Sequence, residues 1–417
     1  MLLFRYTLSC LLCALCAIQV YSQQGQAQSS RLDSLVAANS RVLQMKNGML
    51  QGPGAEFLLA EAAQAQFVAL GEEHNTTEIP ELTTVLFRAL EDRYRFRFLA
   101  IEQDPITMRW TAEPPVRGRR DQVVAIAQRY PYAFTFVSDQ ELTMLAQIGA
   151  TSRTSARPIW GCDQAFGGTH ILDRLRAITF SPAAREFIRT LRDAAWEKER
   201  KRDLDKHHYM GKEPKTDLLA KLREVVRPKS GSEAEMLVLS LIISDRIYSN
   251  HREGNYYENA YEREQYMKRR FLDEYRQAHT IERRPPKVLL KFGLWHLYRG
   301  FTPNHQQSLG NFVSELATAN NSGSFHLAIF PNNAPGGYGD LGKWSDQAPK
   351  LLGRSLKATE WTLVDLRPLR AEYGRLAKEV SPDFKDGFRR LIFGYDAALF
   401  IGGMHSGTYH SNPGVEY

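Results

Sequence analysis

Carboxylates and histidines stand directly after four short apolar runs of this chain. The runs and the polar residues that follow them are 67–70 with Gly71-Glu72-Glu73-His74, 98–101 with Glu102, 159–161 with Asp163, and 288–290 with Gly293 and His296. A histidine oriented by a carboxylate can act as a general base, because the carboxylate fixes the imidazole tautomer and stabilises the imidazolium that forms. Histidines and carboxylates also suit a divalent metal ion. The pattern therefore indicates a catalytic or metal site assembled from distant parts of the chain.

The first of these corners holds carboxylates and an imidazole side by side. Gly71 lets the chain turn where the strand ends, and either Glu72 or Glu73 can orient His74. The sequence does not decide between the two glutamates. A polar strand end with a histidine at the surface is the alternative interpretation of this corner.

Glu102, Asp163 and His296 extend the same argument. A carboxylate at the end of a buried strand is costly without a partner. This favours a site in which Glu102 and Asp163 each have a partner of their own. A structural ion pair with an arginine is the alternative for both, and Asp163 can instead cap a helix that begins near residue 169. His296 follows Trp295, so a histidine packed in the core is the alternative there. If Glu102, Asp163 and His296 lie close to His74 in the folded chain, a functional site is favoured over these alternatives.

Short apolar runs separated by helical segments are typical of parallel strands buried on both faces. Residues 78–93 carry apolar side chains at helical spacing and predict a helix that crosses between the first two strands. We therefore predict an α/β fold with a mostly parallel central sheet flanked by helices, in which ligands bind at the carboxyl ends of the strands. Further runs with strand character are 287–290, 327–330, 362–365 and 397–401.

The first residues of the chain are typical of targeting rather than of fold. Residues 1–22 place Arg5 before a run rich in Leu, Cys and Ala and end in a small residue, which indicates a secretory signal. A membrane anchor is the alternative, but the run is short for a bilayer. Residues 23–33 have the composition of a flexible tether, and a helix is expected at 34–43. The protein is thus expected to be exported, to the periplasm or the medium, with no transmembrane segment after removal of the signal.

The remainder, 34–417, is predicted to be a single domain with one large insertion. Residues 181–284 are charged and helical without a convincing strand, so we expect a helical cap inserted between strands. After removal of the signal only Cys162 remains, which excludes an internal disulfide. Stability must therefore come from the packed core.

The net charge of +7 is concentrated in two clusters, 117–120 and 198–206. The second cluster also contains acidic residues in a helical pattern, so a solvated helix face is expected rather than a nucleic-acid site. Oligomeric state cannot be read from the sequence.

At this point the order of the motifs resembles the erythromycin-esterase-like family, within the wider superfamily of Tiki-type metalloproteases and haem-uptake (ChaN-like) proteins. The resemblance covers residues 67–402, and the order of the pieces carries most of it. One departure is that only Glu73 separates Glu72 from His74, where the esterases have two residues and the haem-uptake and Tiki branches have one. A second is that Trp295 replaces the asparagine of the family's second histidine region. The matching pieces are Leu70 to His74 with Glu78, 98–102, 134–141 before Leu145, Ile159 to Asp163, Arg263-Glu264 with Met267, 287–296, and Tyr395-Asp396-Ala397.

The resemblance implies roles for individual residues. His74 would be the general base that activates water, with Glu72 or Glu73 and Glu102 orienting it or lining the site. His296 would polarise or protonate the substrate. The substrate-binding residues would be Asp163 and the pair Arg263 and Glu264, of which Arg263 would be a cationic partner from the helical cap.

Three functions compete on this basis. The leading one is an exported hydrolase of a small-molecule ester or related carbonyl bond, which requires no cofactor; a divalent metal ion is a variant of this mechanism. The second is a cell-envelope protein that binds haem or another iron ligand through His or Tyr. The third is a scaffold with a degenerate site.

Overall fold

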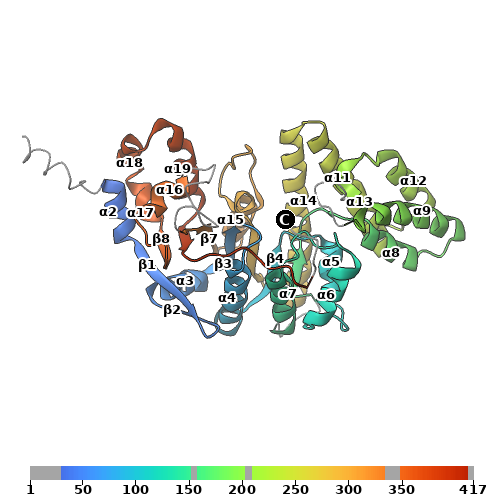
Figure 1. Cartoon of the computed structure of the whole chain (residues 1–417), viewed down its shortest axis with the longest axis horizontal. Helices are drawn as coiled ribbons and strands as arrows, with labels where there is room; N and C mark the ends of the chain where they lie inside the picture. Colours follow the sequence, from blue (N-terminus) through green and yellow to red (C-terminus); the bar gives the residue numbers. More distant parts are fainter. Residues whose placement is uncertain (1–29, 152–156, 202–208, 334–347, 412–417) are drawn as a thin grey trace, which may run out of the picture.

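A mixed sheet runs through the molecule, and helices cover both of its faces (Figure 1). The computed structural model describes residues 30–151, 157–201, 209–333 and 348–411. In these ranges the nine-stranded sheet has the order β2-β1-β8-β9-β7-β3-β6-β4-β5. The strands are β1 Ser40–Lys46, β2 Met49–Gln51, β3 Ala65–Glu72, β4 Phe96–Ile101, β5 Ile159–Gly161, β6 Lys287–Gly293, β7 Gly323–Pro331, β8 Trp361–Asp365 and β9 Ala397–Ile401.

The strands from β9 to β5 pair in parallel, whereas β8, β1 and β2 pair antiparallel at one edge. This confirms the predicted fold class and every predicted strand.

The helices are α2 Arg31–Ala38, α3 Pro53–Gln64, α4 Glu78–Tyr94, α5 Pro105–Thr111, α6 Arg120–Arg129, α7 Asp139–Thr151, α8 Thr169–Ile178, α9 Pro182–Glu199, α11 Tyr209–Lys212, α12 Thr216–Val226, α13 Glu233–Arg252, α14 Tyr256–Glu282, η1 Leu294–Leu297, α15 Leu309–Ala319, α16 Ala348–Gly353, α17 Arg367–Ala371, α18 Tyr373–Glu379 and α19 Pro382–Gly394.

The central strands are apolar without a break because both faces of the sheet are covered. Every residue of β3 is buried. Val68 and Leu70 enter the core on the face covered by α3, α4 and α7, while Phe67 and Ala69 enter the core beneath α14, α15 and α19. The alternation of side chains along a strand therefore divides one apolar run between two cores.

A helix is present where one was predicted at 34–43, but both predicted ends are wrong. Helix α2 covers Arg31–Ala38, so it begins within the predicted tether, and Ser40 already starts β1. Asn47 and Gly48 connect β1 to β2 in a hairpin. Both residues have positive φ, as a tight two-residue hairpin turn requires. The predicted signal and most of the tether lie outside the described residues.

Helices α8, α9, α12 and α13 form a cap with a core of its own, grouped at one end of the molecule (Figure 1). The described residues of the predicted insertion are helical, but two features differ from its predicted limits. Helix α8 precedes residue 181 and yet contributes Ile171, Leu172 and Leu175 to the cap core. Helix α14 runs back to the sheet, where Met267 packs against the strands. It is this helix that brings cap residues to the strand ends.

Residues 202–206 of the second basic cluster lie outside the described residues; arginines at the described positions of both clusters pair with acids. Arg119 contacts Asp121 at 3.1 Å, and Arg200 contacts Glu197 at 2.8 Å, as expected of solvated helix faces. None of the helices in the described ranges combines the length and the apolar character needed to cross a membrane.

Replacement of Leu289 with alanine tests the two-faced core. Leu289 lies on the central strand β6 and is completely buried, so the cavity left behind should lower the free energy of unfolding by about 2–5 kcal/mol. Urea denaturation measures this. Val42→Ala, at an edge-strand position that is 37% exposed, is the control and should cost less than about 0.5 kcal/mol; equal losses would contradict the packing described here.

Candidate active site

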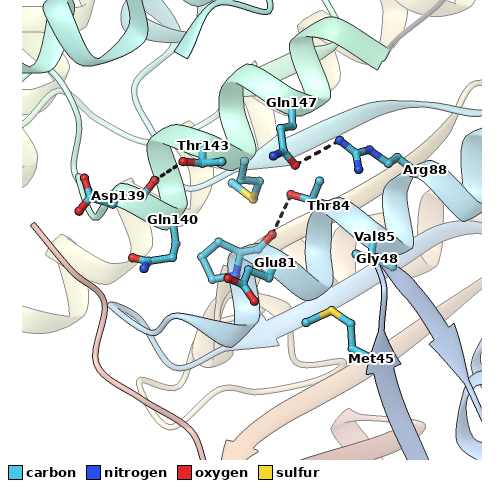
Figure 2. Close-up of a pocket in the computed structure, with 12 residues that line it drawn as sticks. Met45, Gly48, Glu81, Thr84, Val85, Arg88, Asp139, Gln140, Thr143 and Gln147 are labelled. Atoms are coloured by element: carbon cyan, nitrogen blue, oxygen red, sulfur yellow. Dashed lines mark hydrogen bonds between the residues drawn. The ribbon is translucent and has the colours of Figure 1, made fainter. Parts of the chain in front are cut away.

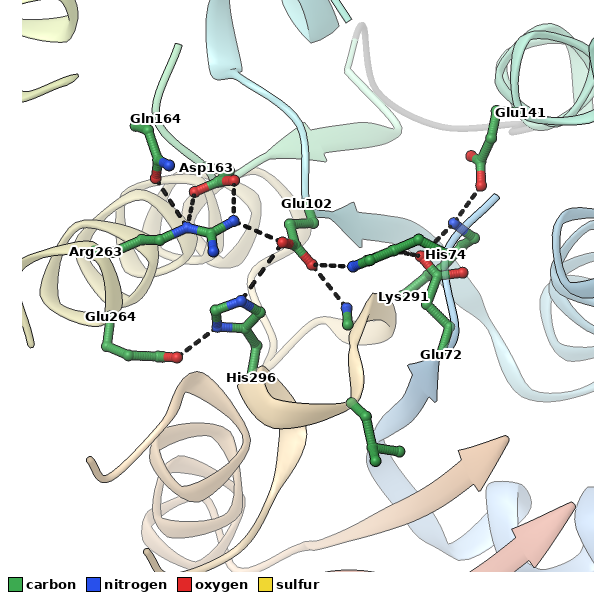
Figure 3. Close-up of polar contacts among 12 residues, drawn as sticks. Glu72, His74, Glu102, Glu141, Asp163, Gln164, Arg263, Glu264, Lys291 and His296 are labelled. Carbon is green, nitrogen blue, oxygen red and sulfur yellow. Dashed lines mark hydrogen bonds and ion pairs between the residues drawn. The ribbon is translucent and has the colours of Figure 1, made fainter. Parts of the chain in front are cut away.

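The carboxyl ends of β3, β4, β5 and β6 bring the predicted residues together. Glu72 ends β3, Glu102 follows β4 directly, Asp163 lies two residues beyond β5, and His296 lies in η1 after β6. Because these four strands are parallel neighbours, their ends meet at one edge of the sheet. Figure 3 shows the polar contacts among the side chains at this edge.

His74 is held at both ring nitrogens by carboxylates. Its Nδ1 lies 3.1 Å from Glu72 Oε1, and its Nε2 lies 3.6 Å from Glu102 Oε2. The ring of Phe136 stacks on the imidazole with centroids 4.2 Å apart. Although burial lowers the pKa of His74, the charges of Glu102 and Glu72 raise it above its ordinary value. The side chain keeps 31% exposure, so solvent reaches it.

The structure decides between the two glutamates of the first corner. Glu72 is buried and contacts His74, whereas Glu73 is exposed. Successive side chains at the end of a strand point to opposite sides, so only one of the pair can face the ring. Glu73 does not join the cluster.

Glu102 lies at the centre of the cluster and contacts four groups. Its Oε2 accepts a hydrogen bond of 2.7 Å from the backbone N–H of Gly293, and its Oε1 accepts one of 2.6 Å from Arg263 Nη2. Both histidines present Nε2 to this carboxylate, His296 at 3.5 Å. Burial raises the pKa of Glu102, but the charges of His296, His74 and Arg263 outweigh it and hold the pKa well below its ordinary value. Glu102 is therefore a permanent anion.

His296 differs from His74 in its protonation. Its Nδ1 lies 2.5 Å from Glu264 Oε1, and Glu264 Oε2 accepts the backbone N–H of Leu309. Burial lowers the pKa of His296, but Glu102 and Glu264 together raise it to about 10. At neutral pH this side chain is an imidazolium that can donate from both nitrogens.

Arg263 connects the cap helix α14 to the sheet edge. Its guanidinium donates to Asp163 at 2.6 and 3.0 Å, to Gln164 at 3.1 Å and to Glu102 at 2.6 Å. Glu102 and Asp163 therefore do form an ion pair with an arginine, which was the structural alternative for both. That arginine is Arg263, a member of the cluster. Asp163 does not cap α8, whose first N–H groups are instead bonded by Glu199.

Two members of the cluster were not among the predicted site residues. Lys291 of β6 is buried and donates to Glu72 at 2.8 Å and to Glu141 at 2.5 Å. A lysine inside the apolar run of β6 is the signal that points to it, because a buried ammonium group requires anionic partners. Glu141 of α7 carries no comparable signal, since acids are common in the first turn of a helix.

The donor set bears on metal binding. Among the described residues no three His, Cys, Asp or Glu side chains are arranged to hold a metal ion. Glu72, Glu102 and Asp163 already bind Lys291 or Arg263, and a divalent ion would have to compete with these cations for the same oxygens.

A cavity of about 220 Å³ opens beside His296 and Arg263, between the start of α14 and the chain that follows η1. A second cavity, of about 460 Å³, lies elsewhere, where α4 and α7 meet the β1–β2 hairpin (Figure 2). Asp139 and Gln140 line it, but no member of the cluster does. Of these two cavities, the smaller one is lined by members of the cluster, namely His296, Glu264 and Arg263.

No protein-family model and no curated protein sequence matches the chain, but solved structures share its fold. A protein of Bacillus cereus aligns over 92% of this chain and 99% of its own at 12% identity, with a TM-score of 0.55. An erythromycin esterase variant in its open conformation aligns over 91% of this chain and all of its own at 14% identity, with a TM-score of 0.52. A succinoglycan biosynthesis protein aligns over 92% of this chain and 99% of its own at 14% identity, with a TM-score of 0.55. These identities show a shared fold and leave the family membership of this chain as a resemblance.

Replacement of Gly293 with alanine tests the close approach at the centre of the cluster. A Cβ at this position would lie 2.6 Å from His74 Nε2 and 3.2 Å from Glu102 Oε2, so the ring must move away from the carboxylate. We expect the pKa of His74, followed by NMR of the imidazole resonances, to fall relative to the unchanged protein. Gly323→Ala, where a Cβ meets nothing within 4 Å, is the matched control. An unchanged His74 titration in Gly293→Ala would contradict this geometry.

The raised pKa of His296 predicts a pH-dependent stability. A group whose pKa rises on folding, here from an ordinary 6.5 to about 10, stabilises the fold fully below pH 6.5 and loses this contribution as pH rises to 10. The free energy of unfolding should therefore decrease between these pH values more steeply in the wild type than in His296→Gln. Parallel pH profiles for the two proteins would show that His296 titrates normally.

Proposed function

We propose that this chain is an exported hydrolase that cleaves an ester or related carbonyl bond with a water molecule activated by His74. The observation that carries the proposal is the position of Glu102 between two imidazoles of different basicity. Two titratable groups whose environments separate their pKa values are the usual basis for assigning a base and an acid. Export rests on the predicted signal at residues 1–22.

His74 supplies the base. With Nδ1–H donating to Glu72, Nε2 of the neutral ring carries the lone pair that accepts a proton from water, although it faces Glu102 at 3.6 Å. Lys291 donates to the same Glu72 oxygen at 2.8 Å, which fixes the carboxylate, so the ring is oriented before substrate binds. The imidazolium that forms is stabilised by Glu102, 3.6 Å from Nε2, which is why a pKa above the ordinary value serves this role.

His296 and Arg263 supply positive charge where the reaction develops negative charge. The oxygen of the activated water adds to the carbonyl carbon, and the carbonyl oxygen becomes an anion that these two cations can stabilise. The carbon–oxygen bond to the alcohol then breaks, and the alcohol takes a proton from an imidazolium. The products are a carboxylic acid and an alcohol, and no cofactor is consumed.

The fold shared with an erythromycin esterase supports this proposal at the level of architecture. The motif order places His74, Glu102 and His296 where the resemblance to the esterase-like family expects its catalytic groups. The haem-binding alternative has no comparable support. Both histidines have their ring nitrogens directed at carboxylates, and a haem-binding protein superposes with a TM-score of only 0.30.

Replacement of His74 with asparagine tests the proposal. Hydrolysis of p-nitrophenyl acetate by the purified mature chain should fall by about 10²–10⁴-fold in kcat, because the general base is lost. His279→Asn, at an exposed position on α14, is the matched control and should retain wild-type activity. Thermal unfolding of both variants establishes that the fold is intact.

The same assay with a chelator, and then with added divalent metal ions, separates the metal-free mechanism from its variant. We expect turnover to be unchanged in both. Hydrolysis that survives in His74→Asn would sink the mechanism, and hydrolysis that the chelator abolishes would replace it with metal-assisted chemistry.

A further inference from the structure

The cavity beside His296 offers neutral hydrogen-bonding groups that the reaction described above does not use. Gln306 and Thr302 line it and are almost completely buried, with 5% and 3% exposure. The amide nitrogen of Gln306 donates to the backbone of Tyr257, while its carbonyl oxygen accepts no hydrogen bond in the described part of the chain. This amide oxygen is therefore free to accept a hydrogen bond from a ligand or water in the cavity.

Two further groups point to the same kind of ligand. The Thr302 hydroxyl accepts the backbone N–H of Gln306 at 3.3 Å, which leaves its hydrogen available to donate. Asn259 donates through Nδ2 to the carbonyl of Ile247 at 2.7 Å, so its side-chain oxygen is available to accept. A mixture of neutral acceptors and a hydroxyl donor matches the hydroxyl groups of a polyol.

The charged residues of the cavity are already compensated. Arg263 binds Asp163 and Glu102, and Glu264 binds His296. A ligand that is ionic before it reacts would therefore have to displace one of these partners. The chemistry favours a neutral, hydroxyl-rich molecule.

An exposed tryptophan completes the cavity. Trp295 lines it and is 47% exposed, beside the imidazolium of His296. Phe301 and Tyr257 lie next to cavity-lining residues along the chain, and their side chains are 63% and 56% exposed. Large aromatic side chains left in water mark contact surfaces, and an indole ring suits a ligand with one apolar face and polar edges.

We propose that this cavity is a sugar subsite, and that the substrate is an ester whose alcohol part is a carbohydrate. This inference rests on the hydrolase function proposed above. The C–H face of one sugar ring packs on Trp295, its hydroxyls bond to Gln306, Thr302 and Asn259, and its acyl group extends toward His296 and His74. A volume of about 220 Å³ equals roughly seven water molecules at about 30 Å³ each, which is enough for one ring and not for a large ligand.

The test compares two acetate esters of a primary alcohol on a six-membered ring, one a carbohydrate and the other a hydrocarbon. One is methyl glucoside acetylated on its primary hydroxyl, and the other is cyclohexylmethyl acetate. In the wild type, kcat/KM should be at least about tenfold higher for the sugar ester, since each hydrogen bond to a ring hydroxyl contributes about 1 kcal/mol. The ratio of the two values should fall by about tenfold in Trp295→Ala and in Gln306→Met. Phe180→Ala, an aromatic that is 96% exposed on the loop after α8, is the control and should leave the ratio unchanged.

The outcomes separate this inference from the function on which it rests. Equal kcat/KM values for the two esters, with hydrolysis still dependent on His74, would overturn the sugar subsite and keep the hydrolase. If neither ester is hydrolysed, quenching of tryptophan fluorescence by methyl glucoside in the wild type but not in Trp295→Phe would support the subsite. Absence of quenching would overturn it.

Discussion

The buried carboxylate of Glu102 is the constraint on which the site depends. An anion at 3% exposure is tolerated only when ionic and hydrogen-bonding partners offset the lost hydration. Here the partners are the guanidinium of Arg263, the N–H of Gly293 and two imidazoles. They come from three segments, the end of β3, the end of β6 with η1, and α14, so the neutralisation of this one side chain at the end of β4 requires that all of them occupy their observed places.

Charges alternate outward from this centre. Lys291 lies between Glu141 and Glu72, Glu72 orients His74, and on the other side Arg263 binds Asp163. Each charged group in this series has a neighbour of opposite sign, and removal of one would leave its partner buried and unpaired. The arrangement also fixes the cap, because Arg263 lies on the helix that joins the cap to the sheet. Stability and site geometry are therefore produced by the same contacts.

The two histidines are chemically distinct because their surroundings are. His296 lies between two carboxylates, which hold it as a cation up to a pH of about 10. His74 also faces two carboxylates, but Lys291 opposes their effect on its pKa. At His296 the opposing cation is Arg263, so each imidazole lies among two carboxylates and one cation. The cavity beside His296 is lined by the charged side chains of Arg263 and Glu264 and by neutral groups that include Trp295 and Gln306, and we propose that the neutral groups serve recognition.

The sequence by itself determined the strands of the parallel sheet, because a strand buried on both faces must be a continuous apolar run, and it determined that His74, Glu102 and His296 follow such runs. It missed the β1–β2 hairpin at the sheet edge, although Asn47-Gly48 is a turn signal. Only the tertiary structure decided that Glu72 rather than Glu73 faces the imidazole, and that Glu141 belongs to the cluster. The physical reason is that strand formation is governed by local apolar pattern, whereas the pairing of buried charges depends on which distant segments pack together.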